Sequence, residues 1–254
     1  MSLEEGMEES IENSIDTLAT LSTFLDDLVL QTSKMDFISF VRLVAPTVVS
    51  DWKMGRHIKI LSDKLQKVQD GEIKRLMVFL PPRSSKSVIC SKIFPAWYIG
   101  NNPQHEILTI SHSDQLASDF GRSVRDIVNT EQFQDIFPGV TLRSDVRAAG
   151  KWKTNLNGTY YAAMSEEDSF SEAGRRYIKE WYPAGLRTRI MPGGSIVIIN
   201  TRYHHDDLCG WLLKQEEVMD MESTYPWEVV KIPAWVDEEA SELLDLPVGS
   251  SYFP

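Results

Sequence analysis

The sequence predicts an α/β fold in which helices flank a mainly parallel central sheet, with an N-terminal helical segment before it. Two short apolar runs, Leu76–Leu80 and Glu106–Ile110, have the length of buried strands, and each is followed by a loop and a helical pattern. A third run, Ser195–Asn200, is the purest buried strand of the chain. Strand, loop and helix repeated in this order imply parallel strands joined by crossover helices.

Length and composition indicate a single folded body. The 254 residues can bury a full core, and one large domain fits them better than two small ones. The 42% hydrophobic and 25% charged residues are ordinary for a globular protein. No apolar run approaches the roughly 18 residues of a membrane span, and the first residues are acidic, unlike those of a signal peptide. Cys90 and Cys209 have neither metal nor disulfide spacing. We therefore expect a soluble, intracellular protein with no membrane partner.

Residues 1–35 form a distinct acidic segment. Residues 1–33 contain eight acidic residues and no Lys or Arg, so the rest of the chain accounts for only −3 of the net charge of −11. Apolar residues recur in this segment at spacings of three and four, which favours one amphipathic helix; a loosely ordered, solvated arm is the alternative. Residues 36–254 have no basic stripe, yet their small net charge does not exclude a nucleic-acid partner.

The remaining elements follow from periodicity and from turn and cap residues. Two helices separated near Pro46 are expected between residues 36 and 71, and Ser113 or Asp114 is expected to cap a later helix. Asn157-Gly158 lies between two alternating runs and predicts a hairpin. Further expected elements are helices at 86–98, 114–129, 131–137, 171–181 and 204–221, strands at 151–155, 159–163 and 227–232, and an acidic tail.

The loop after the first strand has the layout of a phosphate-binding loop. A Pro-Pro-Arg-Ser-Ser turn leads into Lys86-Ser87 at the start of a helix. In such loops backbone N–H groups at a helix N-terminus hold phosphate oxygens, a lysine neutralises them and a hydroxyl reaches Mg²⁺. The pattern G-x-x-x-x-G-K-[ST] has two glycines, and Leu80 and Ser85 occupy their places here. If position 85 requires a positive φ, its serine costs about 1 kcal/mol.

Three segments, LPPRSSKS, EILTISHS and SIVIINTRYHHDDLCGWLL, occur in an order that resembles the ATPase domain of the large terminase subunit of tailed bacteriophages. GEIKRLMVFLPPRSSKS (71–87) is similar to that family's phosphate loop, PPRxGKS, with its lead-in. IVIINTRYHHDDLCGWLL (196–213) resembles a family strand that ends in TRY or TRW before acidic residues and a Leu-rich helix. YYAA, SEEDSFSEA, WYPAGLRTRIMPGG and WEVVKIPAW resemble further landmarks. The resemblance implies that residues 36–254 are a P-loop ATPase-like domain.

The resemblance implies ATP and Mg²⁺ as cofactors and gives roles to the residues of the loop. Lys86 would contact the β- and γ-phosphates, and Ser87 would ligate Mg²⁺. The backbone amides of Ser84 and Ser85 would cradle phosphate. Arg83 would act as an arginine finger or as a sensor of the γ-phosphate.

A second set of roles falls on the segment after Ser195–Asn200. Asn200 and Thr201 match the family's coupling motif, which senses the γ-phosphate and relays hydrolysis to DNA movement. They stand at the carboxyl end of an expected central strand, where ligands bind in open α/β sheets. Arg202, Arg187 and Arg189 are candidates for charge stabilisation; a surface or ion-paired arginine is the alternative for each.

The sequence departs from the family at two landmarks. ATPases of this class need an acidic pair after a short apolar strand, one acid for Mg²⁺ and one to orient the attacking water. In the family this strand lies between the segments that match TYYAA and SEEDSFSEA, and here no such strand intervenes. Glu166 or Glu167 is the candidate substitute for the water-orienting acid. The chain also stops where the linker to a nuclease domain would begin, so we expect no nuclease activity from these residues.

The implied function is ATP-driven translocation of double-stranded viral DNA into a procapsid. The implied partners are the portal protein and the small terminase subunit, and the implied assembly is a homo-oligomeric ring in the host cytoplasm, transiently at the portal vertex. The alternative is a truncated, catalytically impaired remnant that acts as a structural or assembly module. A superfamily helicase would need further motifs after Thr201, and the sequence shows none.

Two smaller groups are also candidates for ligand contacts. The run 204–207 reads His-His-Asp-Asp, but adjacent histidines on a helix point about 100° apart, so capping and solvent-facing roles are favoured over a metal site. Trp52, Arg56 and His57 precede the first strand, where an aromatic ring could pack on an adenine base; helix packing is the alternative.

Overall fold

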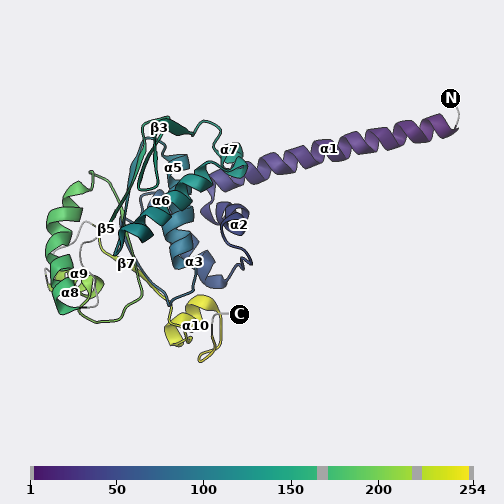
Figure 1. The fold of residues 1–254 in the computed structure, drawn as a ribbon. Helices are drawn as coiled ribbons and strands as arrows, with labels where there is room; N and C mark the ends of the chain where they lie inside the picture. Colours follow the sequence, from purple (N-terminus) through teal and green to yellow (C-terminus); the bar gives the residue numbers. More distant parts are fainter. Residues whose placement is uncertain (1–2, 165–170, 219–224, 252–254) are drawn as a thin grey trace.

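The computed structural model describes residues 3–164, 171–218 and 225–251, with the backbone alone described for residues 3–13. It confirms an α/β fold with parallel strands and flanking helices. The strands form a middle layer, with α8 and α9 on one side and α3, α5 and α6 on the other (Figure 1). Helix α1 projects from this body to the right of the view, and α10 lies at the bottom, below α3 (Figure 1). In the ranges described, no helix combines the length and the apolar character that a membrane crossing requires.

The strands form two sheets. The first has the order β6-β1-β7, and all its strands are parallel. The second has the order β2-β5-β4-β3, in which β2 and β5 are parallel while β3, β4 and β5 form an antiparallel meander. Their bounds are β1 (Arg75–Phe79), β2 (Glu106–Ser111), β3 (Leu142–Ala148), β4 (Lys151–Thr154), β5 (Thr159–Met164), β6 (Ile196–Asn200) and β7 (Glu228–Lys231).

The prediction of one central sheet is therefore wrong. Among the described residues β6 pairs only with β1, and β2 pairs only with β5, so each is the edge strand of its sheet. No described strand joins these two edges into one sheet. The predicted hairpin does form, because Asn157 adopts a positive φ of 74° between β4 and β5.

The helices match most of the expected positions. The expected break near Pro46 comes slightly later, because Pro46 is accommodated inside α2 and the helix ends at Val48. Ser113 caps α6: its hydroxyl accepts a hydrogen bond from the backbone N–H of Leu116 at 3.2 Å. The bounds are α1 (Leu3–Met35), α2 (Phe37–Val48), α3 (Arg56–Gln69), α4 (Lys86–Val88), α5 (Phe94–Asn101), α6 (Asp114–Val128), α7 (Glu131–Ile136), α8 (Glu172–Trp181), α9 (Leu208–Val218) and α10 (Glu238–Leu244).

Two expectations near the C-terminus need correction. Helix α9 begins at Leu208 and not at residue 204, because residues 201–207 form a turn that ends in the capping side chain of Asp207. The acidic tail contains helix α10, whose N-cap Asp237 accepts a hydrogen bond from the N–H of Ala240 at 2.9 Å. Acidic residues in the first turn, Glu238 and Glu239, favour this helix through its dipole.

Strand β1 lies at the centre of the core because it is buried on both faces. Leu76 and Val78 belong to a large apolar cluster shared with α2, α3, α5 and α6. Met77 and Phe79, on the opposite face by the two-residue period of a strand, pack in a smaller cluster with residues of α9. The large cluster also includes Tyr160 of the second sheet, so both sheets rest on the same helical layer.

Candidate functional site

The loop predicted to bind phosphate follows β1 and has an unusual backbone. Arg83 and Ser85 both have positive φ angles, 64° and 59°, and α4 begins directly afterwards at Lys86. The left-handed region costs a residue with a Cβ roughly 1–2 kcal/mol, so two such residues so close together require support from their surroundings. Ser85 adopts the left-handed conformation, with φ 59° and ψ 10°, so the cost expected for a serine with a positive φ applies at this position. Ser84 between them is buried, whereas Arg83 is exposed.

Lys86 folds back over this loop. Its ammonium group donates a hydrogen bond to the carbonyl oxygen of Pro81 at 3.1 Å, so one side chain joins the two ends of the turn. Partial burial lowers the pKa of Lys86, and the neighbouring Cys90 opposes part of that shift. Ser87 follows in the first helical turn and is half-buried. The structure therefore places a cation and a hydroxyl beside the backbone of a left-handed turn at a helix start.

His57, at the start of α3, holds the loop from the other side. Its Nε2 lies 3.1 Å from the carbonyl oxygen of Ser84. A carbonyl only accepts, so Nε2 carries the proton of the neutral imidazole. Burial lowers the pKa of His57. The ring also passes so close to Gly55 that a Cβ there would lie 2.6 Å from it. His57 therefore has a structural role, the alternative to an adenine contact: its ring donates a hydrogen bond to the backbone of the loop.

The segment after β6 meets the same loop. Parallel pairing places Asn200 opposite Phe79 at the carboxyl ends of β6 and β1. The hydroxyl of Thr201 donates a hydrogen bond to the carbonyl oxygen of Leu80 at 3.2 Å. Two motifs that are 121 residues apart in sequence therefore lie side by side. Asn200 and Thr201, the residues that resemble a coupling motif, thus lie next to the end of β1 from which the loop starts.

Asp207 organises the turn beyond Thr201. Its carboxylate accepts hydrogen bonds from Asn200 Nδ2 at 3.2 Å and Arg202 Nε at 3.1 Å, and its other oxygen accepts from the N–H of Gly210 at 2.8 Å. Asp207 is buried, so these donors compensate the desolvation of its charge. The guanidinium of Arg202 also lies 5.3 Å from the ring centroid of Phe79. Arg202 is thus ion-paired within the body, as its alternative interpretation held.

The expected placement of His204 and His205 on a helix is wrong. His204 and His205 precede α9, and their rings stack with centroids 4.4 Å apart, so helical geometry does not separate them. The capping role is confirmed for Asp207. Asp206 pairs with Lys179 of α8 at 2.6 Å. Within the part of the chain that the structure describes, no cluster of three or more His, Cys, Asp or Glu has the geometry to hold a metal ion.

The remaining candidate residues either lie away from the loop or fall outside the residues that the structure describes. Glu166 and Glu167 fall in the undescribed range 165–170. Arg187 and Arg189 are exposed in a short turn, and the guanidinium of Arg189 bonds the carbonyl of Gly185 in the same region. The contacts described for them do not connect either arginine to the loop.

The remaining members of the group before the first strand have packing roles. Arg56 donates hydrogen bonds to the carbonyl oxygen of Leu244 and to the carboxylate of Asp245, both at 2.8 Å. It thereby connects the start of α3 to the end of α10. Trp52 packs against the large core cluster. Neither contact points to an adenine-binding role.

Sequence reasoning missed the contact of His57 with the loop and the part played by Asp207. Asp207 had a local signal, because it stands three residues before Gly210 at the start of a Leu-rich helical pattern. His57 had none, since its partner lies 27 positions away along the chain. No protein-family model and no curated protein matches the chain.

Proposed function

We propose that this chain binds a nucleoside triphosphate through residues 81–87, as the ATPase domain of a large terminase subunit would. The observation that carries the proposal is the contact between Thr201 and Leu80, because it brings the segment that resembles a coupling motif onto the loop that resembles a phosphate loop. Both segments stand at the carboxyl ends of adjacent parallel strands, the place where open α/β sheets bind ligands.

The residues of the loop fit the phosphate part of ATP. Lys86 supplies a positive charge above the turn, and the start of α4 supplies backbone N–H groups without intrahelical partners. Bound Mg²⁺ would neutralise phosphate charge, and the hydroxyl of Ser87 is its candidate ligand. For the acid that orients water, the candidates are Glu166 and Glu167, which lie outside the described residues. The fit therefore supports nucleotide binding more strongly than hydrolysis.

The motor function is the larger part of the same proposal. By resemblance, hydrolysis would drive double-stranded viral DNA into a procapsid. The chain would work as a homo-oligomeric ring with the portal protein and the small terminase subunit, in the host cytoplasm and at the portal vertex. The support is the ordered set of motifs together with the juxtaposition of two of them at the 81–87 loop.

A second candidate is a structural or assembly module that retains the fold without turnover. Ser85 favours it, because a serine in the left-handed region makes the loop less stable than a glycine would. The edge position of β6 favours it as well. In the described ranges no acidic strand pairs with β6 beside the loop, and phosphoryl transfer depends almost wholly on positioning and charge stabilisation.

Nucleotide binding and turnover, measured together, distinguish the two candidates. We expect Lys86→Ala to weaken Mg-ATP binding in calorimetric titration by about 10- to 100-fold, because a charge-assisted hydrogen bond contributes about 1.5–3 kcal/mol. Lys59→Ala, an exposed lysine on α3, is the matched control and should bind as the unchanged chain does.

Turnover decides between motor and module. Phosphate release that stops in Lys86→Ala supports the ATPase. Binding that depends on Lys86 without turnover above background supports the module. If the unchanged chain and Lys86→Ala bind Mg-ATP equally, or if neither binds it, the proposal that this loop binds a nucleotide is wrong.

A further inference from the structure

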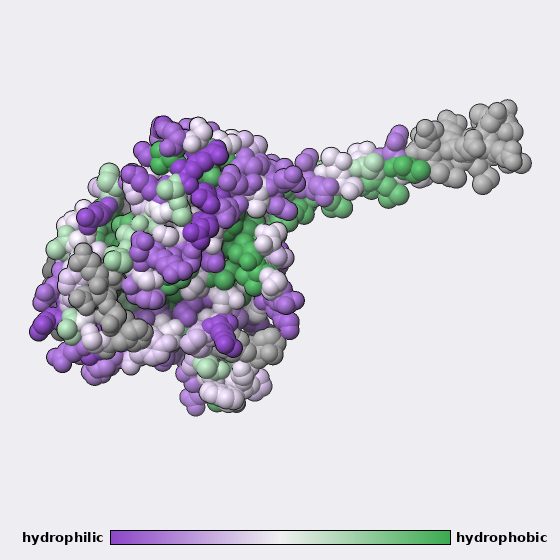
Figure 2. Space-filling view, viewed as in Figure 1, coloured by the Kyte–Doolittle hydropathy of each residue, from purple (hydrophilic) through white to green (hydrophobic). Residues whose placement is uncertain are grey.

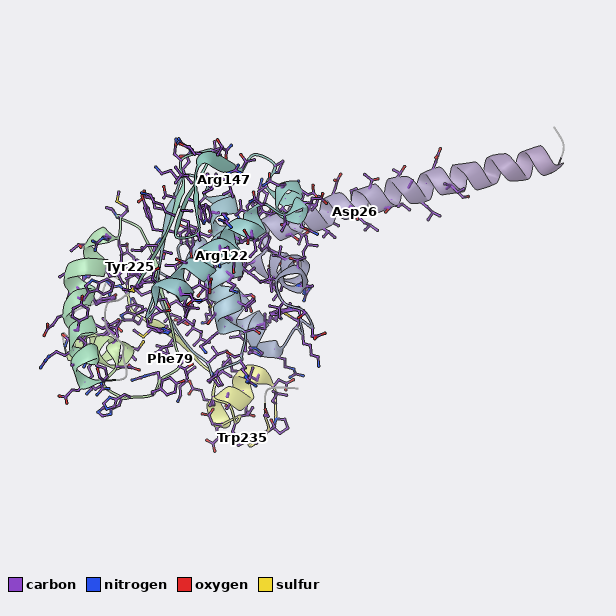
Figure 3. The ribbon with its side chains drawn as sticks, in the orientation of Figure 1. Asp26, Phe79, Arg122, Arg147, Tyr225 and Trp235 are labelled. Atoms are coloured by element: carbon purple, nitrogen blue, oxygen red, sulfur yellow. The ribbon has the colours of Figure 1, made fainter. Side chains whose placement is uncertain are left out.

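The contacts that the structure describes between helix α1 and the body lie near the C-terminal end of the helix. The indole N–H of Trp97 donates to the carbonyl of Ser33 at 3.0 Å, and the side-chain amide of Asn101 donates to the carbonyl of Lys34 at 3.1 Å. Leu30 packs against the large core cluster. The preceding turns project into solvent, and the labelled Asp26 lies on this projecting part (Figures 1 and 3).

The projecting part of α1 exposes large apolar side chains to solvent, which is unfavourable for a helix that stays unpaired. Figure 2 shows hydrophobic residues along this part of α1. Exposed fractions reach 66% for Leu18 and 57% for Leu25, large values for leucines on one helix. We define the α1 stripe as the exposed residues Ile15, Leu18, Leu21, Phe24, Leu25, Leu28 and Val29. A contiguous apolar surface of this kind marks an interaction site.

The sequence of the stripe has the seven-residue period of a coiled coil. With Ile11 at position a of a heptad, Leu18 and Leu25 also fall at a, and Leu21 and Leu28 fall at d. The pattern covers three heptads, residues 11–31, which as a helix are about 30 Å long. Ser14 is the one polar residue among the a and d positions of these heptads.

The heptad positions of the acidic residues indicate which kind of helix can pair with α1. In these heptads Asp16, Asp26 and Asp27 occupy positions f, b and c, on the side away from the a/d seam, and the sequence pattern assigns Glu12 to position b. Positions e and g, which carry the interhelical ion pairs of coiled coils, hold no charged residue. A basic partner helix would thus find no acid at the seam to pair with. A second copy of the same helix would meet no like charge there.

We propose that α1 associates with α1 of another copy of this chain through the α1 stripe, as a coiled coil. The last turns of each helix anchor it to its own body, so the coil joins whole molecules. This proposal rests on α1 and its contacts with the body, and it does not depend on nucleotide binding at residues 81–87.

The test is the molar mass of the full chain in solution, by light scattering and sedimentation equilibrium. We expect a multiple of the 28.9 kDa chain mass at micromolar concentration. The double variant Leu18→Glu with Leu25→Glu places charges at two a positions and should give 28.9 kDa. The matched control Ala19→Glu with Thr23→Glu adds the same charges at exposed b and f positions and should keep the larger mass.

Several outcomes would overturn the proposal. One is an unchanged chain that stays at the mass of one copy at tens of micromolar. Another is a stripe variant that keeps the larger mass, because the interface would then lie elsewhere. A single-copy chain that binds a Lys- and Arg-rich helical peptide would show that the stripe serves a different partner. Tryptophan fluorescence and the melting temperature of the body should be equal in both double variants, which excludes general misfolding as the cause.

Discussion

His57 is the clearest example of a single residue that fixes the conformation of the loop. Its imidazole donates to the carbonyl of Ser84, between the two residues with positive φ. A buried carbonyl left without a donor costs about 1–3 kcal/mol, so this bond stabilises a backbone that is otherwise unfavourable. Because burial lowers the pKa of His57, the ring is neutral in the folded protein at neutral pH.

This pKa predicts a pH dependence of stability. The folded pKa lies below the unfolded value of 6.5, so the free energy of unfolding is fully retained above about pH 6.5. It falls as the pH drops from 6.5 toward the lower pKa of the folded state, because the unfolded chain binds the proton more tightly. The expected slope is at most about 1.4 kcal/mol per pH unit. Urea unfolding between about pH 7.5 and about pH 5.5 measures it.

His57→Gln should remove this part of the slope. Its amide retains a donor for the carbonyl of Ser84 but does not titrate. His112→Gln, at an exposed position, is the control and should keep the slope of the unchanged chain. Equal slopes for His57→Gln and the unchanged chain would mean that His57 is not responsible.

Ser85 shows which part of the loop conformation could be predicted from the sequence and which part could not. The sequence identified position 85 as the one where glycine is expected and gave the condition under which serine is costly. Only the backbone shows that the condition holds, since φ at Ser85 is 59°. Arg83 was unexpected, because a positive φ at an arginine has no signature in the neighbouring residues.

At the scale of elements, α6 and the second sheet are joined by a close backbone approach. The indole N–H of Trp152 donates to the carbonyl of Gly121 at 3.1 Å, and the rings of Trp152 and Tyr160 stack at 5.1 Å. A Cβ on Gly121 would lie 2.1 Å from the carbonyl oxygen of Ala149. Glycine is therefore required for α6 to lie this close to the meander.

Gly121→Ala should destabilise the protein by about 1–3 kcal/mol, the usual cost of forcing atoms into a packed site. The backbone oxygen it meets has little freedom to move. Chemical denaturation measures the change. Gly139→Ala is the control, because a Cβ there meets no atom within 4 Å. Equal stability of the Gly121 and Gly139 variants would contradict the close approach.

The helix after the loop is another case where an element differs from its prediction. The expected helix 86–98 is divided by a short π-helical segment, η1 (Ile89–Ile93), between α4 and α5. Pro95 explains the irregularity: proline has no N–H, and its ring collides with the carbonyl four residues before it in a regular helix. The widened turn, in which the N–H of Phe94 bonds the carbonyl of Ile89, accommodates the proline.

At the scale of the whole molecule, one apolar core connects the two sheets. Leu65 of α3 and Ile127 of α6 are buried in the same cluster, although β1 belongs to one sheet and Tyr160 to the other. A shared core implies that both sheets lose their packing together. We therefore expect the body to unfold in a single cooperative transition.

Leu65→Ala and Ile127→Ala test this expectation. Each should lower the free energy of unfolding by about 2–5 kcal/mol and shift the same transition, followed by tryptophan fluorescence and near-ultraviolet circular dichroism. Leu243→Ala removes a 44%-exposed side chain and should have little effect. Two separate transitions, each moved by only one of the two variants, would show that the sheets are independent units.

The sequence by itself determined that β1, β2 and β6 are strands followed by loops, that a hairpin turns at Asn157-Gly158, and that a cap starts α6 at Ser113 or Asp114. Each depends on residues within a few positions of one another, so periodicity, turn chemistry and cap chemistry are sufficient to recognise them. The tertiary structure alone decided that the strands form two sheets and that Thr201 and His57 both bond to the loop. These features depend on which distant segments pack together, and a contact across 27 or 121 residues leaves no pattern in the local sequence.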